Sequence, residues 1–467
     1  MSVPGADDPG SEEPRADEPR ANEPLPVESE AQLIEWIAEG EKPRAAWRVG
    51  TEHEKIGLRA DDMTPVPYEG DRGIAAVLSG IARADGWTEI SEGGNVIALA
   101  KEGASITLEP GGQLELSGAP LETIHQTCDE FHQHLEVVRS VSEPLGIVWL
   151  SLGMNPLYAV PDIPVMPKAR YEIMRSYLPT RGEMALQMMH LTATVQANFD
   201  FSSEADMVQK MRTALTVTPI VSAIFANSSL GEGKANGFAA RRLQIWRHTD
   251  PDRCGVLPFA FEAGFGYERY VQWALDVPMF FIVRDGRYLA ANGKSFREFL
   301  ARGLDGHTAI LDDWAIHLTT LFPEVRLKQI LEVRGADAVP PGLICALPAL
   351  WKGILYDDSA LAAAGALAID TSPEAREAAL DDVARRGLDA ELGGRTALEW
   401  ARELVGIASE GLRRIGHSGR VDSDERGYLD PISEQLELGK SPGQVVLERW
   451  EGEWERSVQS LIGYARY

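Results

Sequence analysis

The sequence predicts an α+β protein in which antiparallel strands pack against helices, and three observations lead to this class. Several segments alternate apolar and polar residues with a period of two, as strands with one buried face do. Longer segments repeat apolar residues at the spacing of an amphipathic helix. Two strand-like segments are separated only by a Pro-Gly-Gly turn, which joins antiparallel strands. These patterns favour a sheet backed by helices.

Four segments carry the strand pattern. The clearest is His190–Phe201, where Leu, Ala, Val and Phe line one face and His, Thr, Gln, Asn and Asp line the other. Arg48–Leu58 and Val325–Arg334 alternate in the same way, and Ser105–Ser117 is predicted as a hairpin. Each strand therefore has one face for a core and one face for water or a ligand.

The hairpin admits two registers around Pro110–Gly112. A loop of two residues would place Glu109 opposite Leu114, whereas a loop of three residues places it opposite Gln113. We prefer the longer loop, because it gathers the apolar side chains of the hairpin on one face. Its polar face then carries Glu109, Gln113 and Glu115.

Helical spacing follows between and after these strands, and some helix ends are marked by their residue types. Gly387 is a natural C-terminal glycine, and Ser441 with Pro442 forms a good start. The predicted helices are Ala31–Ala38, Leu121–Ser142, Ser203–Ala226, Pro373–Arg386, Ala397–Ile415 and Pro442–Ala465. No later segment has the composition of a linker, so residues 31–467 are predicted to form one large domain.

The first 30 residues differ from the rest in composition. They hold six Pro, three Asp and six Glu against two Arg, and no aromatic residue. Such a segment buries too little apolar surface to offset its chain entropy, so residues 1–30 are predicted to be a disordered acidic tail. It also lacks the apolar stretch of a secretory signal, and we therefore expect a cytoplasmic protein.

Composition excludes several classes of partner. The 467 residues carry a net charge of −26, so a generic nucleic-acid or anionic-membrane partner is not expected. No apolar run approaches the roughly 18 to 20 residues of a membrane span. The three cysteines, Cys128, Cys254 and Cys345, are too few for a disulfide scaffold and lack the spacing of a structural zinc site.

The polar faces of the four strands predict chemistry. Carboxylates gathered on one face repel one another unless they are neutralised, and hard divalent cations with oxygen ligands commonly do this. A magnesium site in turn implies a phosphorylated substrate. The alternative is that these residues are only the solvated face of half-buried strands. The residues concerned are Glu52, Glu54, Glu109, Gln113, Glu115, Gln196, Asn198, Glu332 and Arg334.

Common phosphate-binding and catalytic motifs are absent on inspection. Gly286–Ser295 has the wrong spacing for a P-loop, and Gly264–Gly266 lacks the third Gly of a dinucleotide loop. Gly439–Gly443 matches the G-x-S-x-G pattern, but no strand precedes it, and Ser441 is better explained as a helix cap. Any phosphate would therefore be held by metal ions and arginine.

Ordered motifs from about residue 35 to the C-terminus resemble the plant and proteobacterial type of glutamate-cysteine ligase. The motifs are Thr51–Lys55, Glu109–Pro120, His125–Cys128, Asp162–Lys168, Asp200–Met207, Phe225–Ser228, Phe322–Lys328, Leu331–Asp337 and Leu355–Asp358. The resemblance implies a glutamine-synthetase-like carboxylate-amine ligase fold, with a curved antiparallel sheet that receives ATP, Mg²⁺, L-glutamate and L-cysteine.

In that family the γ-carboxylate of glutamate attacks the γ-phosphate of ATP, and the amine of cysteine then displaces phosphate to give γ-glutamylcysteine. The resemblance implies that the five Glu, at positions 52, 54, 109, 115 and 332, hold Mg²⁺, for which Mn²⁺ can substitute. Arg334 would stabilise the transferred phosphoryl group. Glu332→Gln is therefore expected to remove activity while leaving the strand folded.

The resemblance extends to further residues. Arg242 matches an arginine that holds a substrate carboxylate or the phosphoryl group, although its neighbour Arg241 leaves the match uncertain by one place. Gln196 and Asn198 would bind substrate, or would form a cross-strand amide ladder instead. Cys128 and Cys345 match two family cysteines that form a redox-responsive disulfide, and two buried free thiols are the alternative.

The leading hypothesis is thus an enzyme for the first step toward glutathione, a monomer or redox-sensitive homodimer. A related ligase with another amine acceptor, or γ-glutamylcysteine made for ergothioneine, would use the same chemistry. An inactive relative that binds nucleotide or metal as a regulatory module is an alternative of another class.

Overall fold

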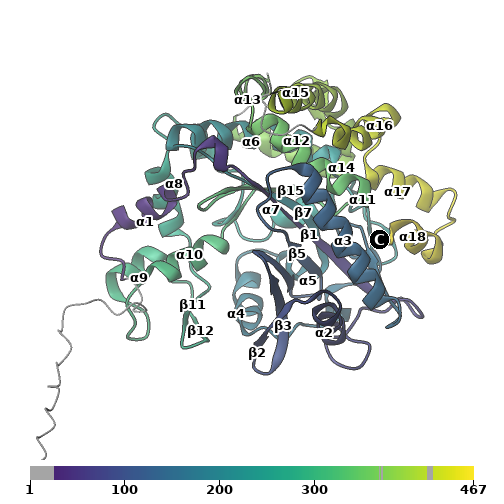
Figure 1. The fold of residues 1–467 in the computed structure, drawn as a ribbon, viewed down its shortest axis with the longest axis horizontal. Coiled ribbons are helices and arrows are strands. Elements are labelled where there is room, and N and C mark those ends of the chain that lie inside the picture. Colours follow the sequence, from purple (N-terminus) through teal and green to yellow (C-terminus); the bar gives the residue numbers. More distant parts are fainter. Residues whose placement is uncertain (1–25, 368, 370–371, 418–423) are drawn as a thin grey trace, which may run out of the picture.

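An antiparallel sheet of nine strands runs through the middle of the molecule (Figure 1). The computed structural model describes residues 26–367, 369, 372–417 and 424–467. The strands follow the order β14-β15-β7-β1-β5-β4-β3-β2, and β6 pairs with β1. They are β1 (Val49–Arg59), β2 (Thr88–Glu92), β3 (Asn95–Lys101), β4 (Ala104–Leu108), β5 (Leu114–Ser117), β6 (Ile147–Leu150), β7 (Thr194–Phe199), β14 (Val325–Leu327) and β15 (Leu331–Asp337). The predicted α+β class is confirmed.

Helices cover one face of this sheet. Val195, Ala197 and Phe199 of β7 belong to the same core as helices α3 (Ile124–Ser142), α6 (Glu204–Ile224) and α12 (Ala346–Leu355). A further helix, α15 (Ala397–His417), contacts α6 and α12 from outside, at the top of Figure 1. The helix α2 (Ile74–Asp85) packs on β3. Since neighbouring residues of a strand face opposite ways, Gln196 and Asn198 lie on the face of the sheet opposite these core helices.

The remaining elements surround this framework. The other helices are α1 (Glu30–Ala38), α4 (Ala169–Tyr177), α5 (Ala185–Leu191), α7 (Arg241–Arg247), α8 (Tyr267–Asp276), α9 (Phe296–Arg302), α10 (Leu311–Thr319), α11 (Pro341–Ile344), α13 (Asp358–Gly365), α14 (Pro373–Arg386), α16 (Asp430–Leu438), α17 (Pro442–Glu451) and α18 (Val458–Ala465). The short strands are β8 (Leu230–Gly231), β9 (Lys234–Ala235), β10 (Cys254–Gly255), β11 (Phe281–Arg284), β12 (Arg287–Ala290), β13 (Phe322–Pro323), β16 (Glu391–Leu392) and β17 (Arg395–Thr396).

The preferred hairpin register is confirmed. Thr107 is the direct partner of Glu115, and Leu108 is the partner of Leu114. The backbone N–H of Glu109 donates to the carbonyl oxygen of Gln113 at 2.9 Å. Glu109 at the turn and Glu115 in β5 are therefore held on one rigid hairpin, because the residues that flank its loop are bonded to each other.

The predicted strand from His190 is wrong at its start. Residues up to Leu191 belong to α5, and β7 begins only at Thr194. The hydroxyl of Thr192 donates to the carbonyl oxygen of Met188, four residues back, as a side chain at a helix end does. Four residues of apparent alternation do not distinguish a strand from a short buried helix, which explains the error.

Two other segments are interrupted. Val325–Arg334 is not one strand but the antiparallel pair β14 and β15, because the chain reverses at residues 328–330. The predicted helix Pro442–Ala465 is divided into α17 and α18, and Glu455 and Arg456 between them have φ of 45° and 63°. A helix cannot pass through left-handed residues. By contrast, α14 has the predicted bounds and is followed by Gly387 at φ 58°.

The end of the predicted tail contacts the domain. Pro26 forms an isolated bridge with Ile310, and Glu30 is the first residue of α1 and pairs with Arg297 at 2.8 Å. Residues 1–25 of that tail lie outside the described residues. Within the described part of the chain, no helix combines the length and apolarity needed to cross a membrane.

We predict that the hairpin carrying Glu109 and Glu115 tolerates no side chain at Gly111, in its turn. A Cβ atom there would lie 2.4 Å from the carbonyl oxygen of His190. Gly111→Ala should therefore lower the free energy of unfolding by about 1–3 kcal/mol in urea titrations. Gly406→Ala, in open space on α15, is the matched control and should raise it by about 0.5–1 kcal/mol. Equal effects of the two changes would contradict the prediction.

Candidate active site

A cavity of about 300 Å³ lies on the face of the sheet opposite α3, α6 and α12. Its polar wall comes from the central strands β1, β5, β7 and β15, and the hairpin turn and α7 complete it. Its apolar wall comes from α4, α5, α10 and the β11–β12 pair, which contribute Met174, Met188, Ile316, Phe281, Val283 and Tyr288. The polar residues on the wall include Glu52, Glu54, Glu109, Gln113, Glu115, Arg170, Thr194, Gln196, Arg242, Arg326 and Arg334.

Four of the five predicted glutamates share this wall. Glu54 of β1 is the direct cross-strand partner of Glu115 of β5, and Glu52 lies two residues along the same face. Directly paired residues bring their Cβ atoms to about 4.5–5.5 Å. Glu109 extends the row from the hairpin turn. The antiparallel register therefore concentrates negative charge at one end of the cavity.

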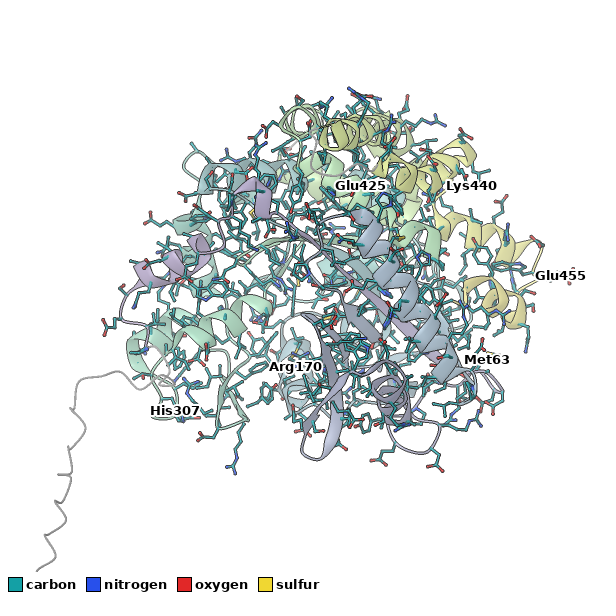
Figure 2. The ribbon with its side chains drawn as sticks, viewed as in Figure 1. Met63, Arg170, His307, Glu425, Lys440 and Glu455 are labelled. Atoms are coloured by element: carbon teal, nitrogen blue, oxygen red, sulfur yellow. A yellow bond between two sulfur atoms is a disulfide. The ribbon has the colours of Figure 1, made fainter. Side chains whose placement is uncertain are left out.

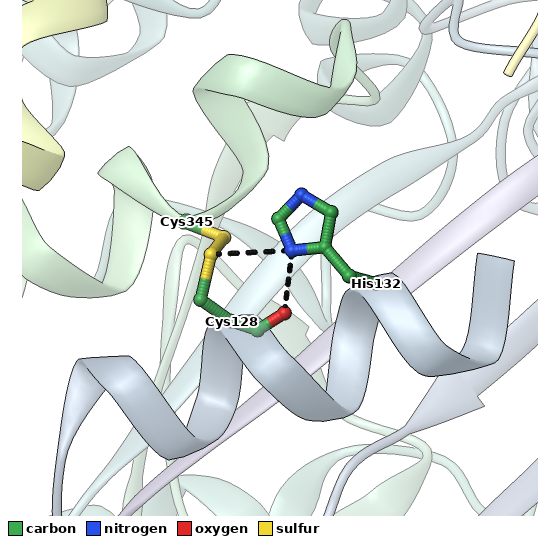
Figure 3. Close-up of side chains that lie close together, drawn as sticks. All are labelled: Cys128, His132 and Cys345. Carbon is green, nitrogen blue, oxygen red and sulfur yellow. Dashed lines mark hydrogen bonds between the residues drawn. A yellow bond between two sulfur atoms is a disulfide. The ribbon is translucent and has the colours of Figure 1, made fainter. Parts of the chain in front are cut away.

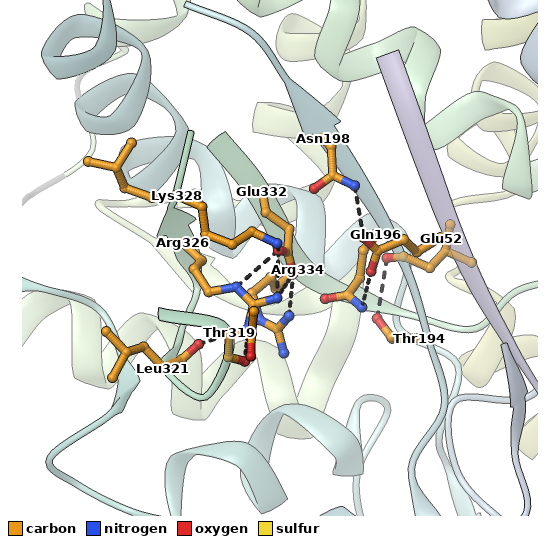
Figure 4. A network of polar contacts seen from close by, with 12 residues as sticks. Glu52, Thr194, Gln196, Asn198, Thr319, Leu321, Arg326, Lys328, Glu332 and Arg334 are labelled. Carbon is orange, nitrogen blue, oxygen red and sulfur yellow. Dashed lines mark hydrogen bonds and ion pairs between the residues drawn. The ribbon is translucent and has the colours of Figure 1, made fainter. Parts of the chain in front are cut away.

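Neighbouring side chains orient these carboxylates. Asn198 donates to Oε1 of Glu52 at 2.8 Å, and Gln196 donates to its Oε2 at 3.2 Å. The backbone N–H of Thr194 donates to Glu54 at 3.1 Å. Figure 4 shows Asn198 and Gln196 directed toward Glu52. Gln196 thus lines the cavity, while Asn198, which is not on its wall, positions Glu52.

The cluster is electrostatically strained. Burial, with the charges of Glu332 and Glu115, raises the pKa of Glu52 to about 7. Burial and the charges of Glu115 and Glu109 raise the pKa of Glu54 well above its usual value. The pKa of Glu115 is also raised, first by burial and then by Glu109. The ionised forms of these carboxylates are therefore disfavoured unless a cation joins them.

Glu332 occupies a different environment. Its carboxylate is fully buried and pairs with Arg326 at 2.6 Å, with Lys328 at 3.0 Å and with Arg334 (Figure 4). Burial opposes its ionisation, but the three cations outweigh burial and hold its pKa well below normal. Glu332 does not line the cavity. Its predicted role as a metal ligand would require one of these cations to give way.

Arginine side chains also line the cavity. Arg334 and Arg326 line it while sharing Glu332, and Arg242 joins them from α7. Arg242 donates to the carbonyl oxygen of Arg334 at 3.3 Å, and Asp337 lies 3.9 Å from its guanidinium. The neighbouring Arg241 instead stacks over the ring of Phe238 at 4.7 Å. Of the two candidate positions, the structure therefore places Arg242 at the site.

Sequence reasoning missed two cations on the cavity wall. Arg326 is the direct cross-strand partner of Glu332, and its strand parity, shared with Glu332 and Arg334, was the signal that could have found it. Arg170 lies at the start of α4, where no strand pattern marks it, and its guanidinium donates to the hydroxyl of Tyr171 at 3.2 Å. The only signal was its position two residues after the motif Asp162–Lys168.

The oxygen-rich wall fits magnesium. Its candidate donors are carboxylates and amides, and the carbonyl oxygens of Gln196 and Asn198 have no hydrogen-bond partner. In the described residues, no three carboxylates bring oxygens within 4.8 Å of one another. Mg²⁺ typically takes one or two protein carboxylates and completes its shell with substrate phosphates and water. The wall therefore suits Mg²⁺ that arrives with a nucleotide better than free Mg²⁺.

Residues 48–461 match the sequence pattern of glutamate-cysteine ligase family 2. The chain belongs to this family. It is 45% identical to the chloroplastic glutamate–cysteine ligase of Medicago truncatula, over 94% of this chain and 85% of that protein. The chloroplastic glutamate–cysteine ligase of Arabidopsis thaliana is 46% identical over 92% and 81%. The resemblance proposed from the motifs is confirmed.

A solved structure shares the fold of this chain. The glutamate–cysteine ligase of Francisella tularensis, in complex with AMP, superposes with a TM-score of 0.57 over 90% of this chain and 87% of that chain. Its sequence identity of 12% limits the likeness to the fold. The predicted carboxylate-amine ligase fold is thereby confirmed.

The expected cytoplasmic location is wrong by these comparisons. The relatives from Medicago truncatula, Nicotiana tabacum and Arabidopsis thaliana are all named as chloroplastic enzymes. The prediction had relied on the missing apolar stretch of a secretory signal. An apolar stretch is a feature of secretory signals alone, because plastid import peptides are amphipathic and have no apolar core.

The disulfide implied by the resemblance is present. Cys128 of α3 and Cys345, just before α12, are bonded, and their Cα atoms lie 5.6 Å apart. Cys254 is the one free cysteine of the three. The bond lies on the helical side of the sheet, and no residue of the cavity wall takes part in it.

We predict that Glu332→Gln destabilises this ligase as well as inactivating it, unlike the purely local effect that the sequence suggested. Removing the charge leaves three cations without their shared buried partner, which costs about 3 kcal/mol or more. Urea titration measures the loss. Glu403→Gln breaks the exposed pair with Arg395 and should stay within about 0.5 kcal/mol. A stable Glu332→Gln protein would contradict the anchoring role.

We also predict a pH-dependent stabilisation by magnesium and nucleotide together. The raised pKa of Glu52 means that the ligand-free protein loses stability as the pH rises from about 4.5 to about 7. Bound Mg²⁺ needs the ionised form. The increase in Tm caused by Mg²⁺ with a non-hydrolysable ATP analogue should therefore be larger at about pH 8 than at about pH 6. An equal increase at both pH values, or the full increase with Mg²⁺ alone, would contradict this.

Proposed function

We propose that this chain joins the γ-carboxylate of L-glutamate to the amine of L-cysteine at the expense of ATP, giving γ-glutamylcysteine, ADP and phosphate. One observation carries the proposal: a cavity whose wall combines carboxylates with arginines, in a chain about 45% identical to glutamate–cysteine ligases. The reaction is the first step of glutathione synthesis. Its two half-reactions, phosphoryl transfer and amide-bond formation, require different residues of the cavity wall.

The first half transfers the γ-phosphoryl group to the glutamate carboxylate. An oxygen of that carboxylate attacks the phosphorus, the bond to ADP breaks, and γ-glutamyl phosphate results. This transfer depends on positioning and on neutralising the charge of the moving group. Arg242, which is buried, and Arg334, which is partly buried, line the cavity as permanently charged donors, and we assign them this role. Glu332 holds Arg334 in place through their ion pair.

The second half makes the amide bond. The cysteine nitrogen attacks the γ-carbonyl carbon, and phosphate leaves with the oxygen that came from glutamate. Both amino acids present carboxylates, so the cavity needs cations besides those that meet the phosphates. Arg170 lies on the wall away from Glu332, with its Nε buried and unpartnered, and Tyr171 holds it. We assign it to a substrate carboxylate.

The acidic end would hold Mg²⁺ bound to ATP. The ligands are the carboxylates of Glu52, Glu54, Glu109 and Glu115, and Gln196 contributes an amide oxygen nearby. When bound, Mg²⁺ neutralises phosphate charge and polarises the transferred group. The raised pKa values of Glu52 and Glu54 in the ligand-free protein support this assignment, because a bound cation favours their ionised forms. Mn²⁺ offers the same preference for oxygen ligands and should substitute.

We predict that the purified protein releases ADP only when L-glutamate, L-cysteine and MgATP are all present, with γ-glutamylcysteine detected by mass spectrometry. A panel of other amines tests the acceptor, and release of ADP with another amine but not cysteine would redirect the proposal. No release with any amine would remove it.

Two arginine variants make this assay specific. Arg334→Lys keeps a charge but loses the planar donor fork, so kcat should fall by about 100-fold or more. Arg449→Lys alters an exposed residue whose nearest acid, Glu453, is 3.9 Å away, and it should leave kcat unchanged. Equal activities of the two variants would exclude Arg334 from the reaction.

A further inference from the structure

A second group of ligand-forming side chains lies outside the cavity, around the disulfide (Figure 3). His132 lies one helical turn after Cys128 on α3, and its Nδ1 is 3.6 Å from the sulfur of Cys128. The ligand atoms of Cys128, His132 and Cys345 all lie within 4.8 Å of one another. In the described part of the chain, this is the one cluster of three potential metal ligands so close together.

We propose that the reduced form of this cluster binds one Zn²⁺ ion. A dithiol reductant supplies two electrons and two protons, which convert the disulfide into two thiols while the reductant becomes a disulfide. Zn²⁺ then displaces the two thiol protons and binds two thiolates and the imidazole of His132, with water as the fourth ligand. The proposal concerns these three side chains alone and does not depend on the ligase reaction.

The distances suit a tetrahedral zinc site. Zinc–sulfur and zinc–nitrogen bonds of about 2.3 and 2.05 Å at a tetrahedral angle place sulfur and nitrogen about 3.6 Å apart. The sulfur of Cys128 and Nδ1 of His132 already have this separation. The i, i+4 spacing on one helix face fixes it. Only Cys345 must move, since the two sulfurs separate to about 3.8 Å in such a site.

Other contacts keep the two helices docked when the disulfide opens. The carboxylate of Glu425 is buried between α3 and α12, where it pairs with Lys352 of α12 at 2.7 Å. The same carboxylate accepts the backbone N–H of Ile124, the first residue of α3, at 2.9 Å. Lys352 also donates to the carbonyl oxygen of Glu122 at 3.1 Å. The frame of the site therefore survives reduction.

The access of zinc to the site and the proton balance of its binding also fit the proposal. Cys128 and Cys345 are buried, whereas His132 is exposed, so zinc can enter from solvent on the His132 side. Nδ1 of His132 now contacts the carbonyl oxygen of Cys128 at 2.7 Å, as a donor. Metal binding replaces this hydrogen bond with an Nδ1–zinc bond. The imidazole then carries its proton on Nε2 instead of Nδ1. Bound zinc would hold both thiolates and block their re-oxidation.

The test titrates Co²⁺, a spectroscopic probe for Zn²⁺, into the full-length protein after reduction and removal of the reductant. Cys254→Ser removes the third thiol, so only Cys128 and Cys345 remain. We expect a sulfur-to-cobalt charge-transfer band that saturates at one equivalent and is reversed by Zn²⁺. The oxidised protein should show no band. Cobalt at the carboxylate cavity has only oxygen ligands and gives no such band.

His132→Gln is the decisive variant, because it keeps both cysteines and the disulfide. It should weaken Zn²⁺ binding by about tenfold or more, since even the loss of an outer-shell partner costs about 10 to 100-fold. His125→Gln, an imidazole on the same helix that contacts Tyr428 instead, is the matched control and should bind normally. Absence of the band, insensitivity to His132→Gln, or loss of the fold on reduction would each overturn the proposal.

Discussion

Glu54 and Glu115 are paired directly across two strands of the central sheet, so their like charges are held close together by backbone hydrogen bonds. Such a pair weakens a sheet unless something compensates it. Here the remaining sheet and the helices behind it fix the strands in spite of the repulsion. A divalent cation would relieve the repulsion between the ionised forms, and the sheet has already organised its binding. Without a cation, burial and the neighbouring carboxylates raise the pKa values of Glu54 and Glu115, in spite of more distant lysine and arginine charges.

The charge of Glu332, in contrast, is neutralised by cations of the protein itself. Glu332 is surrounded by three cations, and two of these, Arg326 and Arg334, also face the cavity. One buried carboxylate thus fixes two guanidinium groups, although Arg326 already donates to Glu332 and to the carbonyl oxygens of Thr319 and Leu321. The cavity wall therefore combines glutamates that need cations with arginines that need anions. A magnesium-bound nucleotide, with cations and phosphates on one molecule, complements both kinds of residue.

Strand parity revealed much of this site in the sequence, because residues two apart on a strand share a face whatever the strand's partners are. Glu52, Glu54 and Gln196 were found in this way. Parity also places Arg326 on the face of Glu332, so this residue could have been found. Parity could not show that residues 325–334 form two strands, which makes Arg326 the direct partner of Glu332. Arg170 lies on a helix start, whose place beside the cavity depends on tertiary packing. The break between α17 and α18 was missed because left-handed Glu455 and Arg456 leave no mark in composition.

Anomalous diffraction from crystals grown with Mn²⁺ and a non-hydrolysable ATP analogue tests the central claim most directly. The account predicts manganese peaks on the cavity wall, within about 2.5 Å of carboxylate oxygens from Glu52, Glu54, Glu109 or Glu115 and of phosphate oxygens. Glu332 should keep its ion pairs with Arg326 and Arg334. Peaks away from these glutamates, or manganese bound to phosphate and water alone, would contradict it.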